Sequence, residues 1–226
     1  MEEILCYIIM LVVPYLICGI STAIIVTKIK SGEDIRLSGS GSAGLTNTLR
    51  TQGKTAAVLV LFGDVLKGVL SVLAVRFAFL FIADIDVRLE KSWVLYAAGI
   101  MACLGHIFPV YFKFKGGKGV LVTCAVLYAI DWRSASILLG LFIIIVAVTR
   151  YVSLGSIIAG SCYPACVLVL SIINDDPTPY LNAACGVVIA AILVLSHKKN
   201  IIRLINKNEK KLGVSERKDK KVKQSK

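Results

Sequence analysis

The sequence predicts an all-α integral membrane protein, because of its composition, the length of its apolar runs and the distribution of its charges. The chain has 226 residues, of which 57% are hydrophobic, and its mean hydropathy is +0.79. A soluble domain is usually only about 45 to 50% apolar. The net charge of +12 would suit a nucleic-acid binder, but a chain this apolar has the bilayer as its expected solvent, and we expect no nucleic-acid partner.

Apolar runs of about 20 residues predict membrane-spanning helices. Six such runs occupy residues 4–27, 55–83, 93–112, 134–149, 154–173 and 181–196. A seventh, residues 119–130, is short, and we interpret it as a half-buried helix inside the bundle. We therefore expect about seven helices, with five or six as alternatives. The first run follows Met1-Glu2-Glu3, which lacks the positive leading region of a secretory signal, so we expect a retained helix.

The lysines and arginines predict the orientation of these helices. If the N-terminus lies outside, the inside segments are residues 28–54, 113–118, 150 and 197 onward. These segments hold 21 lysines and arginines, against 3 in the outside segments. Because such an excess marks cytoplasmic loops, we expect the N-terminus outside, the C-terminus in the cytoplasm and the glycine-rich loops on the cytoplasmic face.

The first inside loop, residues 34–50, reads DIRLSGSGSAGLTNTLR. Its glycines let backbone amides approach an anion, its serines add donors, and an arginine offers a bidentate fork for phosphate. We favour an oxyanion cradle over the alternative of a flexible Gly/Ser linker. The candidate site residues here are Ser38, Gly39, Ser40, Gly41, Gly44, Asn47 and Arg50.

The second inside loop, residues 105–119, reads GHIFPVYFKFKGGKG and opens the short seventh helix. Backbone amides, the positive end of that helix and a lysine ammonium could converge there on one phosphate. The loop is not a Walker A motif, which needs a preceding strand and a final Gly-Lys-Ser/Thr. Lysines that snorkel at a membrane edge are the alternative. The candidates are Lys115, Gly116, Gly117, Lys118 and Gly119.

Two further inside segments carry candidates. Ser153 and Ser156, beside Arg150, are either donors to the same anion or helix caps. His197 and Asn200 share one helix face, and the histidine is either catalytic or interfacial. We expect residues 1–197 to form the membrane domain, residues 198–211 an amphipathic interfacial helix on an anionic leaflet, and residues 212–226 a basic disordered tail.

Charged and sulfur-containing residues inside the apolar runs have simpler interpretations. Asp64 and Lys67 are three residues apart in the second run, and we favour a structural pair over a direct catalytic role. All seven cysteines fall in apolar runs, so we interpret them as small buried hydrophobes rather than metal ligands. We expect neither a metal nor a cofactor.

Four motifs together resemble one known family. They are SGSGxxGxTNxxR (residues 38–50), GHxFPV with FKGGKGV (105–120), RYVSLGSI (150–157) and HxxNIxRL (197–204). In this order, over residues 34–209, they closely resemble the bacterial membrane-embedded acyl-phosphate:glycerol-3-phosphate acyltransferases. The resemblance implies an enzyme of phospholipid biosynthesis in the bacterial cell membrane, with its active site facing the cytoplasm. Such an enzyme moves a fatty acyl group from acyl phosphate to the sn-1 hydroxyl of glycerol 3-phosphate, giving lysophosphatidic acid and inorganic phosphate.

The chemistry implied by the resemblance assigns roles to the candidates. An acyl phosphate is an activated anhydride, so we expect direct attack by the glycerol hydroxyl, with Ser40, Arg50, Lys118 and His197 as catalytic residues and the other candidates binding phosphate. His197 is either the general base or a donor, and the substrate's own phosphate is another acceptor for the proton.

The expected partners are the two phosphorylated substrates, membrane lipid and, on family grounds, the soluble enzyme that forms acyl phosphate. A transporter of glycerol phosphate or another organic anion is the competing class, and a membrane scaffold is a third. The glycines and cations of the loops, gathered at one interface, favour the enzyme.

Overall fold

The computed structural model describes residues 1–212, and over that range it is all-helical, as predicted. Residues 213–226, nearly all of the predicted tail, lie outside the described residues. The α-helices are α1 (Glu2–Gly19), α2 (Thr22–Ser31), α3 (Leu45–Gln52), α4 (Lys54–Ala83), α5 (Val87–Glu90), α6 (Trp93–Ile107), α7 (Val120–Ile130), α8 (Trp132–Thr149), α9 (Val152–Ile173), α10 (Pro179–Ser196) and α11 (Lys198–Ile205). Two 3-10 turns cover Ile35–Leu37 and Val110–Phe112.

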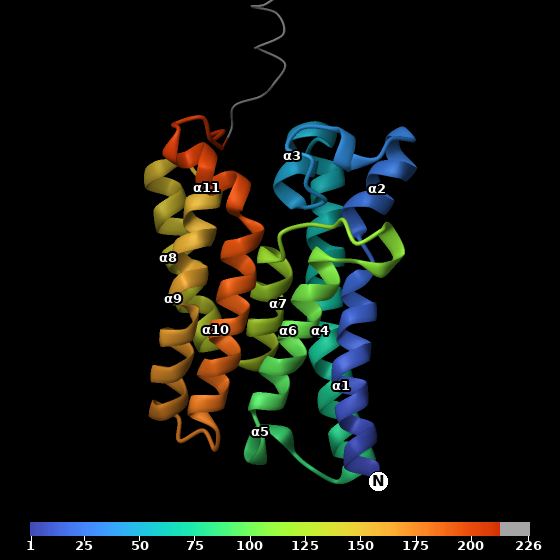
Figure 1. The fold of residues 1–226 in the computed structure, drawn as a ribbon, viewed down its shortest axis with the longest axis vertical. Coiled ribbons are helices and arrows are strands. Elements are labelled where there is room, and N and C mark those ends of the chain that lie inside the picture. Colours follow the sequence, from blue (N-terminus) through green and yellow to red (C-terminus); the bar gives the residue numbers. More distant parts are fainter. Residues whose placement is uncertain (213–226) are drawn as a thin grey trace, which may run out of the picture.

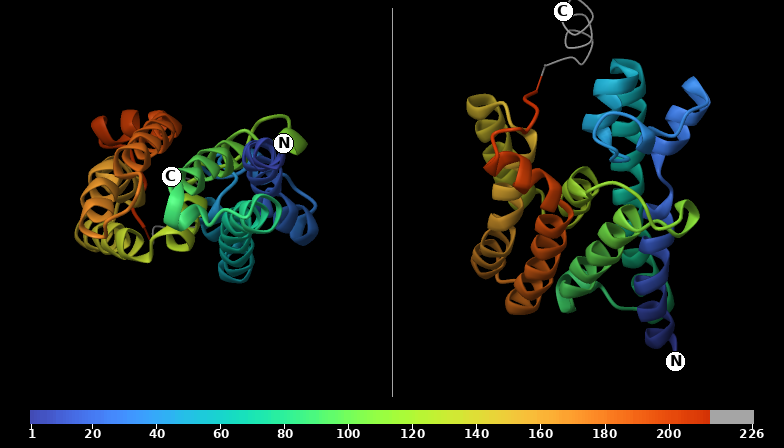
Figure 2. Two further views of the ribbon diagram at one scale, coloured as in Figure 1. Left: turned by 90° about the horizontal axis from the view of Figure 1, so that it is seen from below. Right: turned by 45° about the horizontal axis from the view of Figure 1, so that its top comes forward.

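The long helices form two groups joined by α7 (Figure 1). Helices α1, α4 and α6 contact one another in the first group, and α9 packs against both α8 and α10 in the second. Helix α7 contacts α4 and α6 on one side and α8 on the other, and both views in Figure 2 show the same division. The bundle therefore has an internal boundary, which α7 and the α6–α10 contact bridge.

Six segments of the described chain are long and apolar enough to cross a membrane. They are Glu2–Ser31, Lys54–Ala83, Trp93–Phe112, Trp132–Thr149, Val152–Ile173 and Pro179–Ser196. Each overlaps one of the six predicted runs. Helix α7 is confirmed as a short helix of 11 residues that packs within the bundle.

The first span contains a break that its hydropathy does not reveal. The chain leaves the helix at Ile20 and Ser21, where Ile20 has an extended backbone (φ −69°, ψ 104°). The Ile20 carbonyl accepts a hydrogen bond from Lys67 Nζ at 2.9 Å. The buried lysine thus satisfies a carbonyl that the helix leaves free, which matters where water is scarce.

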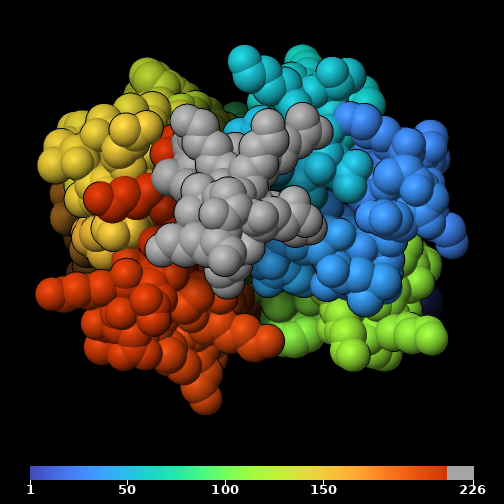
Figure 3. All heavy atoms as spheres, turned by 90° about the horizontal axis from the view of Figure 1, so that it is seen from above, coloured from blue at the N-terminus to red at the C-terminus, as the bar shows by residue number. Residues whose placement is uncertain are grey.

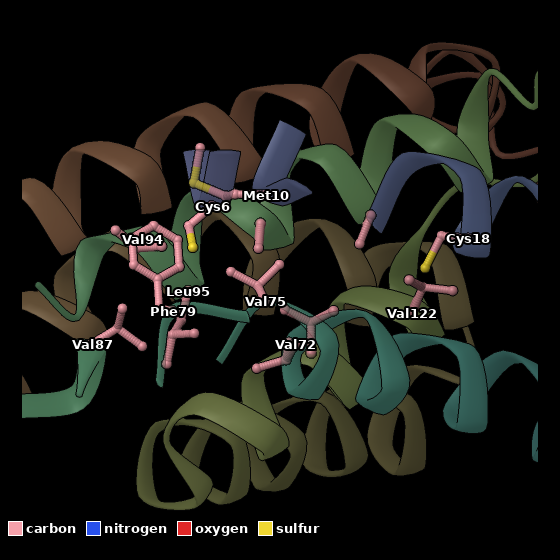
Figure 4. Packing of buried hydrophobic residues seen from close by; sticks show 13 residues of the cluster. Cys6, Met10, Cys18, Val72, Val75, Phe79, Val87, Val94, Leu95 and Val122 are labelled. Atoms are coloured by element: carbon pink, nitrogen blue, oxygen red, sulfur yellow. The ribbon is translucent and has the colours of Figure 1, made fainter. Parts of the chain in front are cut away.

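Buried apolar side chains from α1, α4, α6 and α7 form the largest core cluster (Figure 4). Between lipid-embedded helices the stabilisation comes from close packing rather than from transfer out of water. Cys6 and Cys18 belong to this cluster, as the interpretation of cysteines as small hydrophobes expects. Cys162 is a correction to that interpretation, because its side chain is exposed on α9.

The two ends of the bundle differ in what they carry (Figure 1). Helices α2, α3 and α11 lie at one end, which we call the basic end, with the glycine-rich loops, and His197 is the residue that begins α11. The N-terminus, α5 and the α9–α10 turn lie at the other. All the predicted inside segments are thus together, and the side that each end faces stays a prediction.

The C-terminal helix is shorter than predicted. Helix α11 ends at Ile205 instead of continuing to residue 211. Residues 206–212 turn back across the bundle, where the Leu212 N–H donates to the Arg150 carbonyl at 2.7 Å. The Lys211 ammonium lies over the Tyr151 ring, 5.6 Å from its centroid. This segment therefore packs on the α8–α9 turn instead of extending the amphipathic helix.

Candidate active site

A cavity of about 400 Å³ lies between the two groups of helices and reaches the loops at the basic end. Figure 3 views that end, with the blue residues of the first loop and the red residues of α11 on different sides of its centre. Eleven of the sixteen candidate residues line the cavity: Gly39, Ser40, Gly44, Asn47, Arg50, Lys118, Gly119, Ser153, Ser156, His197 and Asn200. The deeper wall is apolar and includes Leu121, Leu127, Leu138, Phe142, Ala159 and Leu193.

Asn47 holds the first loop from inside. Its side chain is 3% exposed, and its Nδ2 donates to the carbonyls of Ile35 (3.3 Å), Ser38 (3.0 Å) and Ser42 (3.1 Å). Its Oδ1 accepts the Ser40 N–H at 2.8 Å. Both ends of the amide are thus bound to the loop backbone. Asn47 therefore shapes the cradle, and its direct contact with phosphate stays a prediction.

Three candidate glycines likewise donate their backbone N–H groups to backbone carbonyls of the protein. The Gly41 N–H donates to the Ser38 carbonyl (3.1 Å), and neither residue lines the cavity. The N–H groups of Gly116 and Gly117 donate to the carbonyls of Ile107 (3.0 Å) and His106 (3.1 Å). The Gly116 and Gly117 amides thus fasten the second loop to the end of α6, and a contact of these three glycines with phosphate stays a prediction.

Lys115 lies on the exposed surface, outside the cavity. The next candidates along the loop, Lys118 and Gly119, do line it. Gly119 has a φ of +82° at the N-cap of α7, a left-handed conformation that favours glycine. This turn places the Lys118 side chain in the cavity wall.

Arg36 links the two loops and was missed by the sequence analysis. Its Nη1 donates to the carbonyls of Phe112 (2.8 Å) and Lys115 (3.0 Å), while Asp34 accepts from its Nε. Hydrogen bonds from Arg36 hold the pKa of Asp34 below its usual value. The spacing Asp-x-Arg at the start of the loop was the available signal.

Arg50 and Lys118 are cavity cations without a carboxylate partner. The described residues contain four ion pairs, and neither side chain takes part in any of them. Burial lowers the pKa of Lys118 to about 8; nearby Glu209 opposes this shift, and Arg203 and Arg50 reinforce it. A bound anion would offset the cost of holding two cations together. The cavity is therefore suited to a phosphate.

Glu209 also lines the cavity, and the sequence analysis missed it. Its carboxylate accepts hydrogen bonds from Ser153 Oγ (2.8 Å), Asn200 Nδ2 (2.7 Å) and Arg203 Nε (2.7 Å). Burial opposes ionisation, but these hydrogen bonds outweigh it and lower the pKa of Glu209. The available signal was that Glu209 is the only acidic residue between residues 177 and 215.

Ser153 and Ser156, at the start of α9, have separate partners. Ser153 Oγ donates to Glu209, whereas Ser156 Oγ donates to the Val152 carbonyl one turn back in α9 at 2.9 Å. Both side chains are buried and both line the cavity. Asn200 Oδ1 is buried without a protein partner in the described structure. With its Nδ2 held by Glu209, Asn200 offers the cavity an acceptor, which suits a hydroxyl better than a phosphate.

His197 presents an acceptor to the same cavity. Its Nδ1 lies 2.8 Å from the Leu193 carbonyl oxygen, which can only accept, so Nδ1 carries the hydrogen. Burial lowers the pKa of His197, so the ring is neutral near pH 7 and its Nε2 holds a lone pair. Such a nitrogen can take a proton from a hydroxyl. In the described range, no group of three or more His, Cys, Asp or Glu residues has the arrangement of a metal site.

This fold and this cavity define an integral membrane protein with cations and an apolar wall in one cavity between its two groups of helices. Comparisons with known proteins identify the family. The family model described as glycerol-3-phosphate acyltransferase matches residues 8–207. A glycerol-3-phosphate acyltransferase of Clostridioides difficile is 41% identical over 93% of this chain and 98% of its own. That of Bartonella henselae is 38% identical over 89% of both chains.

A solved structure supports the same assignment. The crystal structure of PlsY (YgiH), an integral membrane glycerol 3-phosphate acyltransferase in its glycerol 3-phosphate form, aligns with a TM-score of 0.75 and 34% identity. The alignment covers 92% of this chain and 96% of that one. The present chain belongs to the glycerol-3-phosphate acyltransferase family and is a membrane enzyme of phospholipid synthesis.

Proposed function

We propose that this acyltransferase takes its acyl group from acyl phosphate and places it on the sn-1 hydroxyl of glycerol 3-phosphate. The products are lysophosphatidic acid and inorganic phosphate. The observation that carries the proposal is the presence of Arg50 and Lys118, two cations without carboxylate partners, in one cavity with a deep apolar wall. An acyl phosphate matches both features, because its phosphate can bind the two cations and its acyl chain can lie against the apolar wall. Family membership favours this enzyme over the transporter and the scaffold.

The residues support a direct transfer. Arg50 and Lys118, with Ser40 at the rim, hold phosphate oxygens and stabilise the negative charge that develops. The glycerol hydroxyl attacks the acyl carbon, a new C–O bond forms, and the bond from that carbon to the phosphate oxygen breaks. His197 Nε2 takes the hydroxyl proton, and the released phosphate accepts it. Asn200 Oδ1 accepts a hydrogen bond from a glycerol hydroxyl and so orients the substrate.

The location and partners of the enzyme follow from the same proposal. Loops that bind two phosphorylated substrates are expected on the cytoplasmic side of a bacterial cell membrane, which is also the side that the excess of lysine and arginine predicts for them. A soluble enzyme that forms acyl phosphate is then the expected supplier of the donor, and surrounding membrane lipid takes up the product.

A donor-exchange assay tests the proposal. Purified protein in detergent receives labelled glycerol 3-phosphate with palmitoyl phosphate, palmitoyl-coenzyme A or palmitoylated acyl carrier protein. We expect labelled lysophosphatidic acid with palmitoyl phosphate alone. Lys118→Ala should lower the rate at least a hundredfold, whereas Lys199→Ala, which removes an exposed lysine of α11, should leave it unchanged. Transfer from coenzyme A or carrier protein at an equal rate would refute the proposed donor.

A further inference from the structure

A buried charged network borders the cavity and has no role in the reaction as described so far. Asp64 and Lys67 of α4 and His106 of α6 are 2%, 6% and 6% exposed. Lys67 Nζ lies 2.8 Å from Asp64 Oδ1, 2.9 Å from the Ile20 carbonyl oxygen and 3.1 Å from His106 Nδ1. Thr22 Oγ1 also donates to Asp64 Oδ1 at 2.5 Å. The network thus joins the break in the first span to the end of α6.

The network fixes which nitrogen of His106 carries the hydrogen. An ammonium has three donors and no acceptor, and Lys67 uses its donors on Asp64, Ile20 and His106. The Nδ1 of His106 must therefore accept, which leaves the hydrogen of the neutral ring on Nε2. The ion pair with Asp64 holds the Lys67 ammonium in this position and so maintains the tautomer.

His106 lines the cavity, and its Nε2 atom lies against the loop that carries Lys118. His106 and Asp64 are both among the lining residues. A side-chain carbon added to Gly117 would overlap with His106 Nε2, so that nitrogen lies directly against the residue before Lys118. Among the described residues the structure gives the Nε2–H no protein acceptor. A fixed N–H donor is therefore available in the cavity wall, next to the loop that carries Lys118.

We propose that His106 is a further substrate-binding residue, whose Nε2–H donates to a phosphate oxygen in the cavity. Asp64 and Lys67 act through it as positioning residues. The inference rests on the proposed function, since it needs a phosphorylated substrate in this cavity. The phosphate belongs either to the acyl donor or to glycerol 3-phosphate, and the kinetic measurement distinguishes the two. The competing view is that the network only holds the helices together.

Nitrogen NMR tests the proposal without a measurement of activity. The chain has two histidines, so His197→Gln assigns the two imidazole signals of ¹⁵N-histidine-labelled protein. We expect the His106 ring to be neutral with its hydrogen on Nε2, and inorganic phosphate to shift the Nε2 resonance in a saturable way. A hydrogen on Nδ1, or an Nε2 resonance that does not shift when phosphate is added, would overturn the proposal. This test does not depend on which acyl donor the enzyme uses.

Kinetics then separate binding from a purely structural role. His106→Phe keeps a planar ring but removes the donor, and should raise the KM of one phosphorylated substrate about tenfold, which matches the loss of one hydrogen bond to a charged group. The kcat should stay within about twofold. His106→Gln, which retains an N–H near the same place, should restore most of the affinity. The substrate whose KM responds is the one that His106 contacts.

Ser71→Ala is the matched control, because it removes a buried polar group one turn from Lys67 that lies outside the cavity lining. Its KM values should equal those of the wild type. Equal losses in His106→Phe and His106→Gln, or unchanged KM values in both, would leave the network a structural role and refute the contact. If the wild type transfers no acyl group at all, the proposed function fails, and the NMR titration with phosphate still decides the role of His106.

Discussion

Lys118 combines a half-buried position with a charge that forms no ion pair in the described chain. Its pKa of about 8 means that the ammonium loses its proton as the pH rises through that value. Phosphate affinity should then fall, so we expect the KM of the phosphorylated substrates to rise about tenfold for each pH unit above 8. Initial rates between pH 6.5 and 9.5 measure this.

The arginine variant is the control for that titration. A guanidinium remains charged across the same range, so Lys118→Arg should flatten the rise in KM even if it lowers the rate at every pH. Parallel profiles for the wild type and Lys118→Arg would assign the titration to a different group.

His197 gives the second prediction at this scale. As a general base it works only when neutral, and burial lowers its pKa, so the rate should fall only below the pH where an ordinary histidine gains its proton. His197→Gln should reduce kcat at least a hundredfold and change KM little. It should also remove the fall in rate at low pH. A loss of only a few-fold with an unaltered pH profile would assign the proton to the substrate's phosphate.

At the scale of elements, the second loop depends on the small size of Gly117. A methyl group there would overlap with His106 Nε2 and come within 2.6 Å of the Ala43 carbonyl oxygen. Gly117→Ala should therefore destabilise the protein by about 1 to 3 kcal/mol, the usual effect of overpacking, and displace Lys118. Thermal unfolding in detergent and the acyl-transfer rate measure the two effects.

Gly140 provides the comparison within a helix. It lies in α8, and nothing stands within 4 Å of the position a side-chain carbon would take. Gly140→Ala should raise stability by about 0.5 to 1 kcal/mol, because alanine loses less backbone entropy in a helix. If both variants behaved alike, the crowding around Gly117 would have no energetic consequence.

The helices could be predicted from the sequence more completely than their ends and breaks. Long apolar runs have one stable arrangement in lipid, and all six predicted runs are helical. The break at Ile20 depends on a hydrogen bond from Lys67, which is 47 positions away. A hydropathy profile does not detect such a long-range contact. Similarly, α11 ends at Ile205 while Glu209 turns back to the cavity, and the local run of basic and apolar residues gives no sign of this.

For the molecule as a whole, the site could be predicted as a set of loops but not as a set of contacts. Glycines, serines and cations mark the loops locally, and most of the candidates line one cavity. Arg36, His106 and Glu209 were missed because each acts on a residue far away in the chain or from another element. Asn47, Gly116 and Gly117 have partners in the loop backbone, and composition alone does not distinguish a loop's internal donors from those it offers to a ligand.

The orientation of the whole molecule yields the last prediction. The basic loops and α11 lie at one end of the bundle and α5 at the other (Figure 1). The excess of lysine and arginine predicts that the basic end faces the cytoplasm. Glu90→Cys in α5 and Lys199→Cys in α11 place exposed thiols at the two ends. In intact cells a membrane-impermeant maleimide should label Glu90→Cys, and should label Lys199→Cys only after the membrane is permeabilised.

The native cysteines provide the background for this measurement. Even Cys162, the exposed one, lies midway along the α9 span, where a polar reagent cannot reach it through lipid. The unmodified protein should therefore stay unlabelled in intact cells. Labelling of Lys199→Cys but not Glu90→Cys would reverse the orientation and put the cavity on the outer face. An outward cavity would be inaccessible to an acyl phosphate and a glycerol phosphate made inside the cell, so the same experiment also tests whether the charge pattern and the proposed chemistry agree.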